Sequence, residues 1–338
     1  MKKFIFGFLI LAFSASLLQA QNINISQFDN NPLFVNPGMT GDFEGRLRVN
    51  GYHRNQWTNV LDGASYQTYT LSVDSRFPLG KNTDIGIGIA GLNESSGSLN
   101  YTVKTYQVST ALHSYIGERY KSHHTLSLGV SAGPASQSLD IVSDDFVWSS
   151  EHDGNGGNTG ISPGIMDSLR NIDSYPLLST GLMWSYRSTS RFSARAGVAT
   201  YGLNRPSVSF VSDSGKPLPI FWTLIGQVEL PFANRFSVIP SAYYVKTGSM
   251  DQLTFGTFGR FYNSGESNQR FIQVGIFGKT TRNPEFDIFF NQVYSIQARF
   301  QRENFSIGYA FDRHNLSGLP SGSTHEFSLG YLIGKANK

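Results

Sequence analysis

Along most of the chain, apolar and polar side chains alternate with a period of two. In SYQTYTLSVDSRF, Tyr69, Leu71 and Val73 alternate with threonines, a serine and Asp74, and in TDIGIGIAG isoleucines alternate with glycines. The same period recurs in TYQVSTALHSYIG, HTLSLGVSAG, RFSVIPSAYYV and HEFSLGYLI. Because successive side chains of a strand point to opposite faces, this pattern predicts β-strands with one apolar face.

The length and chemistry of these segments favour a membrane barrel. There are about fourteen segments, most of about ten or more residues, whereas strands of soluble proteins usually have about five or six. About ten residues tilted by about 45° rise roughly 23 Å, the height of the apolar band of an outer-membrane barrel. The second face is small and polar rather than charged, which is typical of a barrel lumen. We therefore predict an all-β fold, an antiparallel transmembrane β-barrel of about 14 strands over residues 44–338, with a secreted β-sandwich that binds glycans as the alternative.

The connections between the predicted strands alternate roughly in length. Short turns such as GERYKS, YRSTSR and LPFANR follow even-numbered strands, and the longest connections, residues 134–178, 203–217 and 313–322, follow odd-numbered strands. Two odd-numbered turns, near Gly248 and near Asn283, are also short. Short periplasmic turns and long external loops are the rule in outer-membrane barrels, so this alternation supports the prediction.

Several single residues carry more local expectations. Pro240 falls inside a strand pattern and cannot donate to a ladder, so we expect a β-bulge there. Aromatic side chains near strand ends are expected to form interfacial girdles. These residues are Trp57, Tyr115, Tyr120 and Tyr331.

Composition narrows the class of protein further. The chain has no cysteine, so no disulfide holds it. Charged residues make up only 15%, and the net charge of +3 includes Lys2 and Lys3, so nothing suggests a nucleic-acid partner. After residue 20 there is no run of about 18 apolar residues, which excludes a helical membrane protein. No cofactor motif is present.

The first twenty residues, MKKFIFGFLILAFSASLLQA, have the layout of a signal peptide. Two lysines precede an apolar run over residues 4–18, and the small Ala20 stands at a plausible cleavage point. The alternative is a transmembrane anchor, but the run is short for a bilayer span and Gln19 and Asn22 follow it. We therefore predict export, with residues 1–20 removed.

Residues 21–43 contain the stretch SQFDNNPLFVNPGMTGDF, which has Asn-Pro twice and matches neither a strand nor a helix pattern. Its apolar side chains Leu33, Phe34 and Val35 need cover. Since this stretch precedes the first strand, it starts on the periplasmic side. We expect it to fold against the periplasmic mouth or into the lumen as a plug, because a barrel of this width is not filled by wall side chains alone. A flexible leader is the alternative.

The same residues resemble the start of the PorP/SprF family of type IX secretion system membrane proteins, in which a Q-[YF]-x-x-N-P-x-x-x-N-P-x-x-x-G segment leads into a Y-R-N-Q-W-like strand. His53 is inserted between the Tyr and the Arg of that motif, and the closing STHEFSLGY resembles the final strand of the family. The matching residues are Gln27, Phe28, Asn31, Pro32, Asn36, Pro37, Gly41, Tyr52, Arg54, Asn55, Gln56 and Trp57.

The resemblance implies an integral barrel of the outer membrane, without enzymatic activity, that works in type IX secretion. Its implied partners are outer-membrane lipid, other secretion components and a secreted surface protein, which in some members is a gliding adhesin. The alternative function is a passive or gated porin for small solutes. A porin constriction usually carries rings of opposed charges, and the inward-facing candidates here are few. They are Asp74, Arg76, Lys104, Arg191 and Arg195.

Other candidate chemistry is weak. His314 and Ser317 lie in one late loop, but nothing in the sequence supplies the third group that would orient the histidine for catalysis. His123 and His124 begin a strand and point to opposite faces, so they do not share one zinc ion.

The long connection between the predicted strands near residues 134 and 178 holds the remaining candidates. Phe146, Val147 and Trp148 are costly to leave exposed, so we expect this loop to cover the external mouth or to dock a secreted partner, with Trp148 as the anchor. The loop also has oxygen ligands suited to calcium, but their spacing fails the calcium-loop pattern. These ligands are Asp144, Asp145, Glu151, Asp153 and Asn155.

Overall fold

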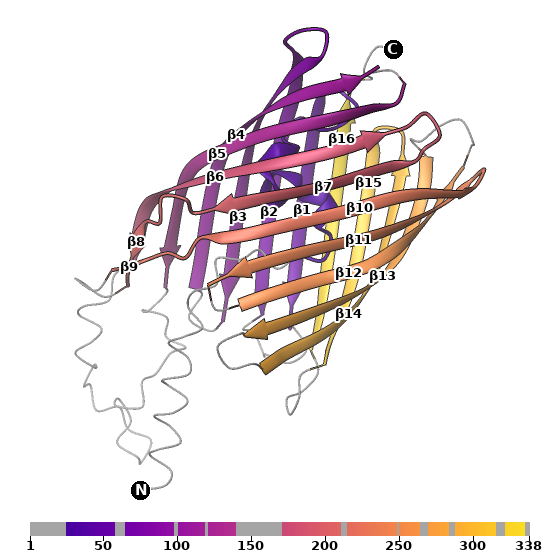
Figure 1. Cartoon of the computed structure of the whole chain (residues 1–338). Coiled ribbons are helices and arrows are strands. Elements are labelled where there is room, and N and C mark those ends of the chain that lie inside the picture. The colour runs from indigo at the N-terminus through magenta and orange to yellow at the C-terminus, as the bar shows by residue number, and fades with distance from the viewer. Residues whose placement is uncertain are drawn as a thin grey trace, which may run out of the picture.

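The computed structural model describes residues 25–57, 65–97, 101–118, 121–139, 171–210, 215–248, 250–263, 270–283, 288–315 and 322–334. Within them, fourteen antiparallel strands form one closed barrel, which confirms the predicted fold class (Figure 1). The barrel strands are β1 (Leu47–Gln56), β2 (Tyr66–Pro78), β3 (Thr83–Ser96), β4 (Tyr101–Gly117), β5 (His123–Ser138), β6 (Ile172–Arg187), β7 (Ser193–Tyr201), β10 (Phe221–Ala233), β11 (Phe236–Thr247), β12 (Met250–Tyr262), β13 (Arg270–Asn283), β14 (Ile288–Arg302), β15 (Phe305–Asn315) and β16 (Ser323–Ile333).

Each barrel strand pairs with its neighbours in sequence order, and β1 pairs with β16 to close the sheet. The strand after β7 in the barrel is β10, because a small separate ladder of β8 (Ser207–Val208) and β9 (Lys216–Pro217) stands between them in the chain. The sequence predicted only a long connection there. Two-residue strands are too short to give a readable alternation, which explains the omission.

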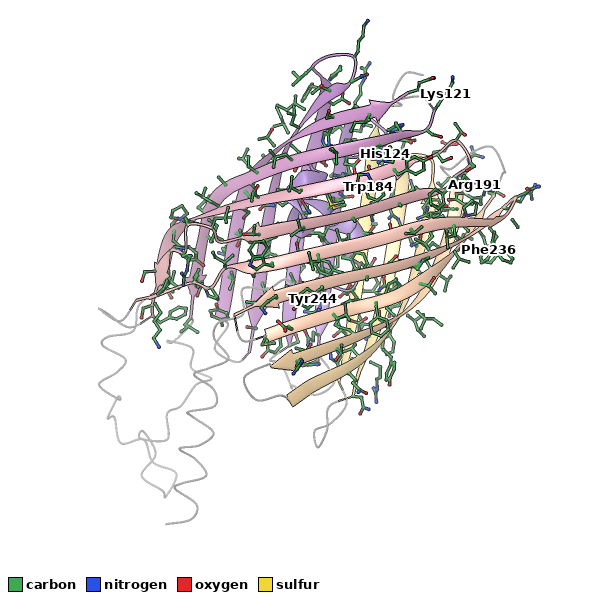
Figure 2. All side chains as sticks on the ribbon, viewed as in Figure 1. Lys121, His124, Trp184, Arg191, Phe236 and Tyr244 are labelled. Carbon is green, nitrogen blue, oxygen red and sulfur yellow. The ribbon has the colours of Figure 1, made fainter. Side chains whose placement is uncertain are left out.

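The two faces of the barrel wall differ as the alternation predicted. Leu71 and Ile89 point outward and are 59% and 58% exposed, whereas Thr70 and Ser72, on either side of Leu71, are buried on the inner face. Figure 2 draws the side chains of the barrel and labels Trp184, which is exposed on the outer face. The apolar outer face meets lipid, and the polar inner face lines the lumen.

The two ends of the barrel differ in their connections. Residues 79–82, 188–192, 234–235 and 303–304 make short turns at one end, which we call the short-turn end. β5 ends and β6 begins at the other end, which we call the long-connection end because more than thirty residues separate these two strands in the sequence. The predicted connection over residues 134–178 was too long. Pro134 and Pro176 are register partners within β5 and β6, and the missing N–H of Pro134 coincides with a gap in the β4–β5 ladder between Thr105/Ala135 and Val108/Ala132.

The prediction of a β-bulge at Pro240 was wrong. Between β11 and β12 the register runs through Pro240 without a shift. Between β10 and β11 no pairing is formed at Ile239 and Pro240, but the same register continues on both sides. The missing N–H of Pro240 therefore interrupts the β10–β11 ladder locally, and no extra residue is inserted as in a bulge. The register shift in this pair lies between Pro231 and Ala233 instead.

The stretch before β1 contains three short helical turns, η2 (Phe28–Asn30), α2 (Pro32–Val35) and η3 (Pro37–Met39), where the sequence reading expected neither helix nor strand. Pro32 and Pro37 each occupy the start of a turn, where a missing N–H is harmless. Each of the two Asn-Pro pairs thus begins a helical turn. Among the described residues, no helix is long and apolar enough to cross a membrane.

We predict that a charge on the outer face near the middle of a strand weakens the barrel. Val130 is 49% exposed on β5, and Val130→Arg is expected to lower the free energy of unfolding by about 2–4 kcal/mol, because an arginine there meets hydrocarbon. Leu79→Arg, in a short turn, is the matched control and should change it by about 1 kcal/mol or less. Urea unfolding in lipid vesicles measures both; equal effects would contradict a lipid-facing wall at Val130.

Candidate functional site

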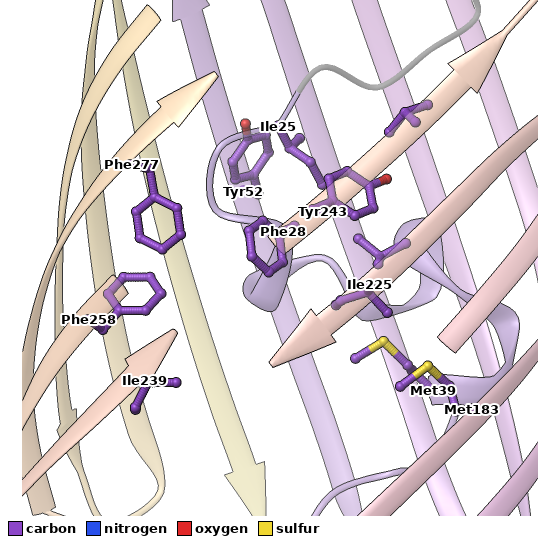
Figure 3. Packing of buried hydrophobic residues seen from close by; sticks show 12 residues of the cluster. Ile25, Phe28, Met39, Tyr52, Met183, Ile225, Ile239, Tyr243, Phe258 and Phe277 are labelled. Atoms are coloured by element: carbon purple, nitrogen blue, oxygen red, sulfur yellow. The ribbon is translucent and has the colours of Figure 1, made fainter. Parts of the chain in front are cut away.

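Residues 25–43, which we call the lumen segment, lie inside the barrel. The helical turns of the segment and its apolar side chains sit between opposite walls (Figure 3). Leu33, Val35 and Asn36 are fully buried, and Ile25 and Phe28 are 1% exposed. A 19-residue stretch with so little exposed surface has to satisfy its backbone polar groups inside the lumen.

The lumen segment runs along the barrel axis. Its last part lies at the start of β1, where Gly41 N donates to Asp74 Oδ2 at 2.7 Å and Asp74 pairs in register with Arg48. Its first part lies near the end of β1, where Ser26 N donates to Glu326, the register partner of Arg54. From the sequence, this stretch was expected to start on the periplasmic side. Instead, the described segment begins toward the long-connection end and descends to the short-turn end.

Four charged side chains surround the beginning of the lumen segment, and we call them the outer charged cluster: Arg54, Lys279, Asp312 and Glu326. All four are buried. Arg54 Nε lies 3.4 Å from Glu326 Oε1, and Lys279 Nζ lies 3.4 Å from Asp312 Oδ2. Two cations and two carboxylates give the cluster no net charge, which is the arrangement that buried charges require.

The outer charged cluster binds the lumen segment through Ser26. The Glu326 carboxylate accepts from Ser26 N at 3.0 and 3.1 Å, and the Ser26 hydroxyl donates to Asp312 Oδ2. Lys279 Nζ donates to Ser26 Oγ at 2.9 Å. Hydrogen bonds to charged groups are about twice as strong as neutral ones, so these charged side chains bind the beginning of the segment firmly.

Apolar packing holds the next part of the segment. The Phe28 ring stacks on Tyr243 with centroids 5.3 Å apart and meets Phe277 edge-on at 6.3 Å. These side chains belong to one buried cluster that joins the segment to opposite walls (Figure 3). The cluster contains Ile25, Phe28, Val35, Met39, Tyr52, Met183, Ile225, Ile239, Tyr243, Val245, Phe258 and Phe277.

Polar side chains of the wall satisfy the carbonyl groups of the middle of the segment. Each donor stands on a different strand, so the segment is bound from several sides rather than laid on one. The three bonds are Gln107 Nε2 to Leu33 O (2.9 Å), Tyr201 Oη to Phe34 O (2.8 Å) and Thr223 Oγ1 to Val35 O (2.9 Å). The polar lumen face of the strands is therefore the hydrogen-bonding complement of this backbone.

Asn36 binds the wall in the opposite sense, as a donor to strand backbone. Its Nδ2 donates to Leu182 O and Val198 O, both at 3.1 Å, and its Oδ1 accepts from Gly38 N at 2.7 Å. Asn36 thus caps its own turn while it contacts β6 and β7. An amide can do both at once, because it carries an acceptor oxygen and an NH2 group with two donors.

Inward-facing glycines let the segment lie directly on the wall. A Cβ added at Gly86 would lie 2.0 Å from Thr40 O, and one at Gly129 would lie 2.3 Å from the Pro37 carbonyl carbon. A Cβ at Gly181 would meet Asn36 Oδ1 at 2.0 Å. Gly86 and Gly129 are required by the close approach of two backbones and Gly181 by the Asn36 side chain, not by strand formation.

The last part of the segment is bound by charges at the short-turn end. Arg48 pairs with Asp74 at 2.7 Å and donates to Met39 O at 3.0 Å. Asp42, which precedes β1, pairs with Arg187 at 2.8 Å. Burial alone raises the pKa of Asp42, but the charge of Arg187, aided by other nearby cations, outweighs it and lowers that pKa from 3.8 to about 2.

The structure brings most of the motif residues together. Gln27, Phe28, Asn31, Pro32, Asn36, Pro37 and Gly41 all lie in the lumen segment, and Arg54 and Gln56 face the lumen from β1. Asn55 is on the opposite face of β1. Trp57 follows the strand with a φ of 65° and packs edge-on against the rings of Tyr66 and His314. Trp57 therefore lies at the mouth rather than in a lipid-facing girdle.

Two expectations about wall residues were wrong. Tyr115 is buried and donates to Asp84 Oδ2 at 3.0 Å, so it faces the lumen and not the interface, whereas Tyr331 is 48% exposed. Of the expected lumen charges, Lys104 is on the outward face and Arg191 lies in a turn, where it donates to the carbonyls of Ala233 and Asn234 at the β10–β11 turn.

The lumen also holds many more charges than the sequence reading counted. Asp74, Arg76 and Arg195 do face inward, as expected. The sequence did not reveal the inward charges that pair with side chains on other strands, because no local pattern connects the two partners. They are Arg48, Arg54, Asp84, Glu229, Arg260, Lys279, Asp312 and Glu326.

Several candidates from the sequence lie outside the described residues: Phe146, Val147 and Trp148, the calcium-loop oxygens, Tyr120 and Ser317. His314 is described; it is buried, and its Nε2 lies 2.7 Å from Thr324 Oγ1. His123 is buried and its neighbour His124 is not, which agrees with opposite faces. No group of three potential metal ligands occurs among the described residues.

Comparison with known proteins adds a family to this geometry. The family model for the type IX secretion system membrane protein PorP/SprF matches residues 17–331. No curated protein matches the chain. Similar solved structures include the CymD monoaromatic hydrocarbon channel, at 11% identity and a TM-score of 0.49, with 93% of this chain and 94% of that chain covered. The Ralstonia pickettii toluene transporter TbuX is 12% identical, with a TM-score of 0.49 and 90% and 94% covered.

We predict that filling one of the inward gaps displaces the lumen segment. Gly86→Ala places a methyl group against the Thr40 carbonyl and should destabilise the barrel by about 1–3 kcal/mol, the usual range for overpacking. Gly226→Ala, where the new Cβ meets nothing within 4 Å, is the control. The measurement is the temperature at which the folded barrel loses its faster mobility in a detergent gel. Identical temperatures for both variants would contradict direct contact at Gly86.

We also predict that the contribution of Asp42 depends on pH. Because its folded-state pKa is below 3.8, the ionised form stabilises the folded barrel above that pH, and this contribution disappears as the pH falls through about 2. Arg187 is 31% exposed, so solvent screens part of the effect. Asp42→Asn should therefore lower the melting temperature at about pH 7, and this difference should shrink as the pH falls through about 2. A difference that grows on acidification would contradict the pairing.

Proposed function

This chain belongs to the PorP/SprF family of type IX secretion system membrane proteins, and from that membership we propose that it couples the secretion machinery to a secreted cell-surface protein, such as a gliding adhesin. The family is one of secretion-system membrane proteins and not an enzyme family. The protein is a β-barrel of the outer membrane, and other secretion components are its partners.

The observation that carries the proposal is the filled lumen. A passive porin needs a continuous aqueous path, and here the lumen segment contacts the wall from β1 to β16 through hydrogen bonds, ion pairs and apolar packing. An opening by withdrawal of the segment would have to break all of these contacts together. The occupied lumen therefore supports a role as an anchor whose working surfaces are its ends.

The proposed docking surface for the secreted partner is the external loop that holds Phe146, Val147 and Trp148. These residues come from the sequence alone and lie outside the described residues. Their apolar side chains are costly to expose at a cell surface, and an aromatic anchor of this type is a frequent centre of a protein interface.

We predict that a tagged copy, purified from detergent-solubilised outer membranes, brings secretion components or one large secreted surface protein with it. Deletion of residues 144–159 should remove the surface protein from the purified material while the barrel and the secretion components remain. Mass spectrometry of the purified fraction measures both, and Asp251→Asn on β12 serves as a control substitution outside the deleted residues.

The alternative function, a passive or gated porin, predicts a different result. A barrel that purifies alone and conducts ions in planar bilayers would support the porin and contradict coupling. Retention of the surface protein after the loop deletion would contradict the proposed docking surface but not the coupling role.

A further inference from the structure

The strand pair β1–β16 closes the barrel and joins strands from opposite ends of the chain. The other neighbouring strands are connected directly in the chain, apart from β7 and β10, whose connection holds β8 and β9. In a hairpin the turn fixes the register, but no turn connects β1 to β16. Something else has to select the register of the closing pair.

Alternation alone does not select it. A shift of two residues between β1 and β16 keeps every inward side chain facing inward. In the observed register Arg54 faces Glu326, and their side chains form an ion pair. A shift by two would place Glu326 opposite Tyr52 or Gln56 and separate the buried Arg54 from the carboxylate with which it pairs, which disfavours the shifted register.

The lumen segment binds β16 in this same register from inside the barrel. The Glu326 carboxylate accepts from Ser26 N and Gln27 N, and the Gln27 side-chain Nε2 donates to Glu326 O at 3.0 Å. The next inward residue of β16, Ser328, donates to Gln27 Oε1 and accepts from Asn30 Nδ2, both at 2.8 Å. These contacts recognise two successive inward positions of β16, so a shifted strand would lose both.

The same segment is attached to β1. It leads into that strand in the chain, and Arg48 near the start of β1 donates to Met39 O at 3.0 Å. The segment also fits closely against the strand beside β16, since a Cβ at Gly308 on β15 would lie 2.5 Å from Gln27 Oε1. One short stretch of chain thus holds β1 and the strands at the other end of the sequence, across a separation of 300 residues.

We propose that the lumen segment is an internal clasp that closes the barrel by fixing the register of β16 against β1. The clasp travels with β1 during folding and presents the backbone donors of Ser26 and Gln27 to Glu326 when the last strand forms. Binding of Glu326 then places its carboxylate opposite Arg54. Closure is directed in this way by the segment that precedes β1 rather than by a turn.

Disulfide cross-linking tests the proposal without background, because the chain has no cysteine. Val49 and Tyr331 are register partners on the outward face, so Val49→Cys with Tyr331→Cys reports the observed register. Val49→Cys with Leu329→Cys or with Ile333→Cys reports the registers shifted by two. Cross-linking is scored only in the folded, heat-modifiable fraction from outer membranes.

The clasp variant is Gln27→Pro, which removes the N–H and the side-chain amide that bind Glu326. The φ of Gln27 is −86°, close to the proline range, so the backbone is not forced elsewhere. We expect the 49–331 cross-link to fall severalfold while the shifted pairs appear. The milder Glu326→Gln should cause a smaller shift in the same direction, and it keeps the test informative if Gln27→Pro leaves too little folded barrel.

The matched control is Asn36→Ala, which loosens the same segment from β6 and β7, on the wall away from the closing pair. This variant should cross-link in the observed register as the parent does. The proposal is overturned if Gln27→Pro and Glu326→Gln retain the parent cross-link with no shifted product. It is also overturned if Asn36→Ala loses the cross-link equally, because the segment would then act only as a general filler of the lumen.

Discussion

The backbone polar groups of residues 25–43 set the main constraint on this barrel. The stretch is buried, and outside its short turns it forms no regular secondary structure. Each carbonyl that is not bonded within the segment therefore needs a hydrogen-bond donor from the wall. The Gln, Thr and Tyr side chains that line the lumen provide these donors at 2.8–2.9 Å. A lumen of fourteen strands is too wide for its own side chains, and here a piece of the same chain fills it.

Two features of the wall follow from that constraint. Glycines stand where the segment backbone comes closest, so the alternation of isoleucine and glycine in β3 has a different cause on each face. The isoleucines meet lipid, whereas Gly86 makes room for Thr40. Ion pairs stand at both ends of the segment, with Glu326 and Arg54 at its beginning and Asp74 and Arg48 at its end.

Much of the fold could be predicted from the sequence because its signal is local. The period of two determines which side chains face lipid, and turn residues mark the ends of strands, so the number of strands and the closed barrel were predictable. The Asn-Pro pairs also indicated the turns that begin at Pro32 and Pro37, because proline is favoured at the first position of a helical turn. The prediction considered only that proline interrupts a helix.

The charged pairs of the lumen were not predictable for the opposite reason. Lys279 and Asp312 come together only when β13 and β15 are placed in the barrel, and neither strand by itself contains a charged partner that would reveal the pair. Tyr115 shows the same limit, since an aromatic near a strand end suits a lipid interface until its partner Asp84 is known. Local patterns assign a face to a residue, but they do not assign its partner.

The apolar part of the lumen segment also limits what the barrel can do. Ile25, Phe28, Leu33, Phe34, Val35 and Met39 are all buried. At about 1.5–3 kcal/mol for each such side chain, their exposure to a water-filled lumen would cost on the order of 10 kcal/mol. Since about 1.4 kcal/mol is a factor of about ten, an open state would be populated in roughly one molecule in ten million. Passive diffusion through the lumen would then require an input of free energy or a partner that binds the withdrawn segment. An anchor that works through its ends requires neither, and for this reason the filled lumen supports coupling over conduction.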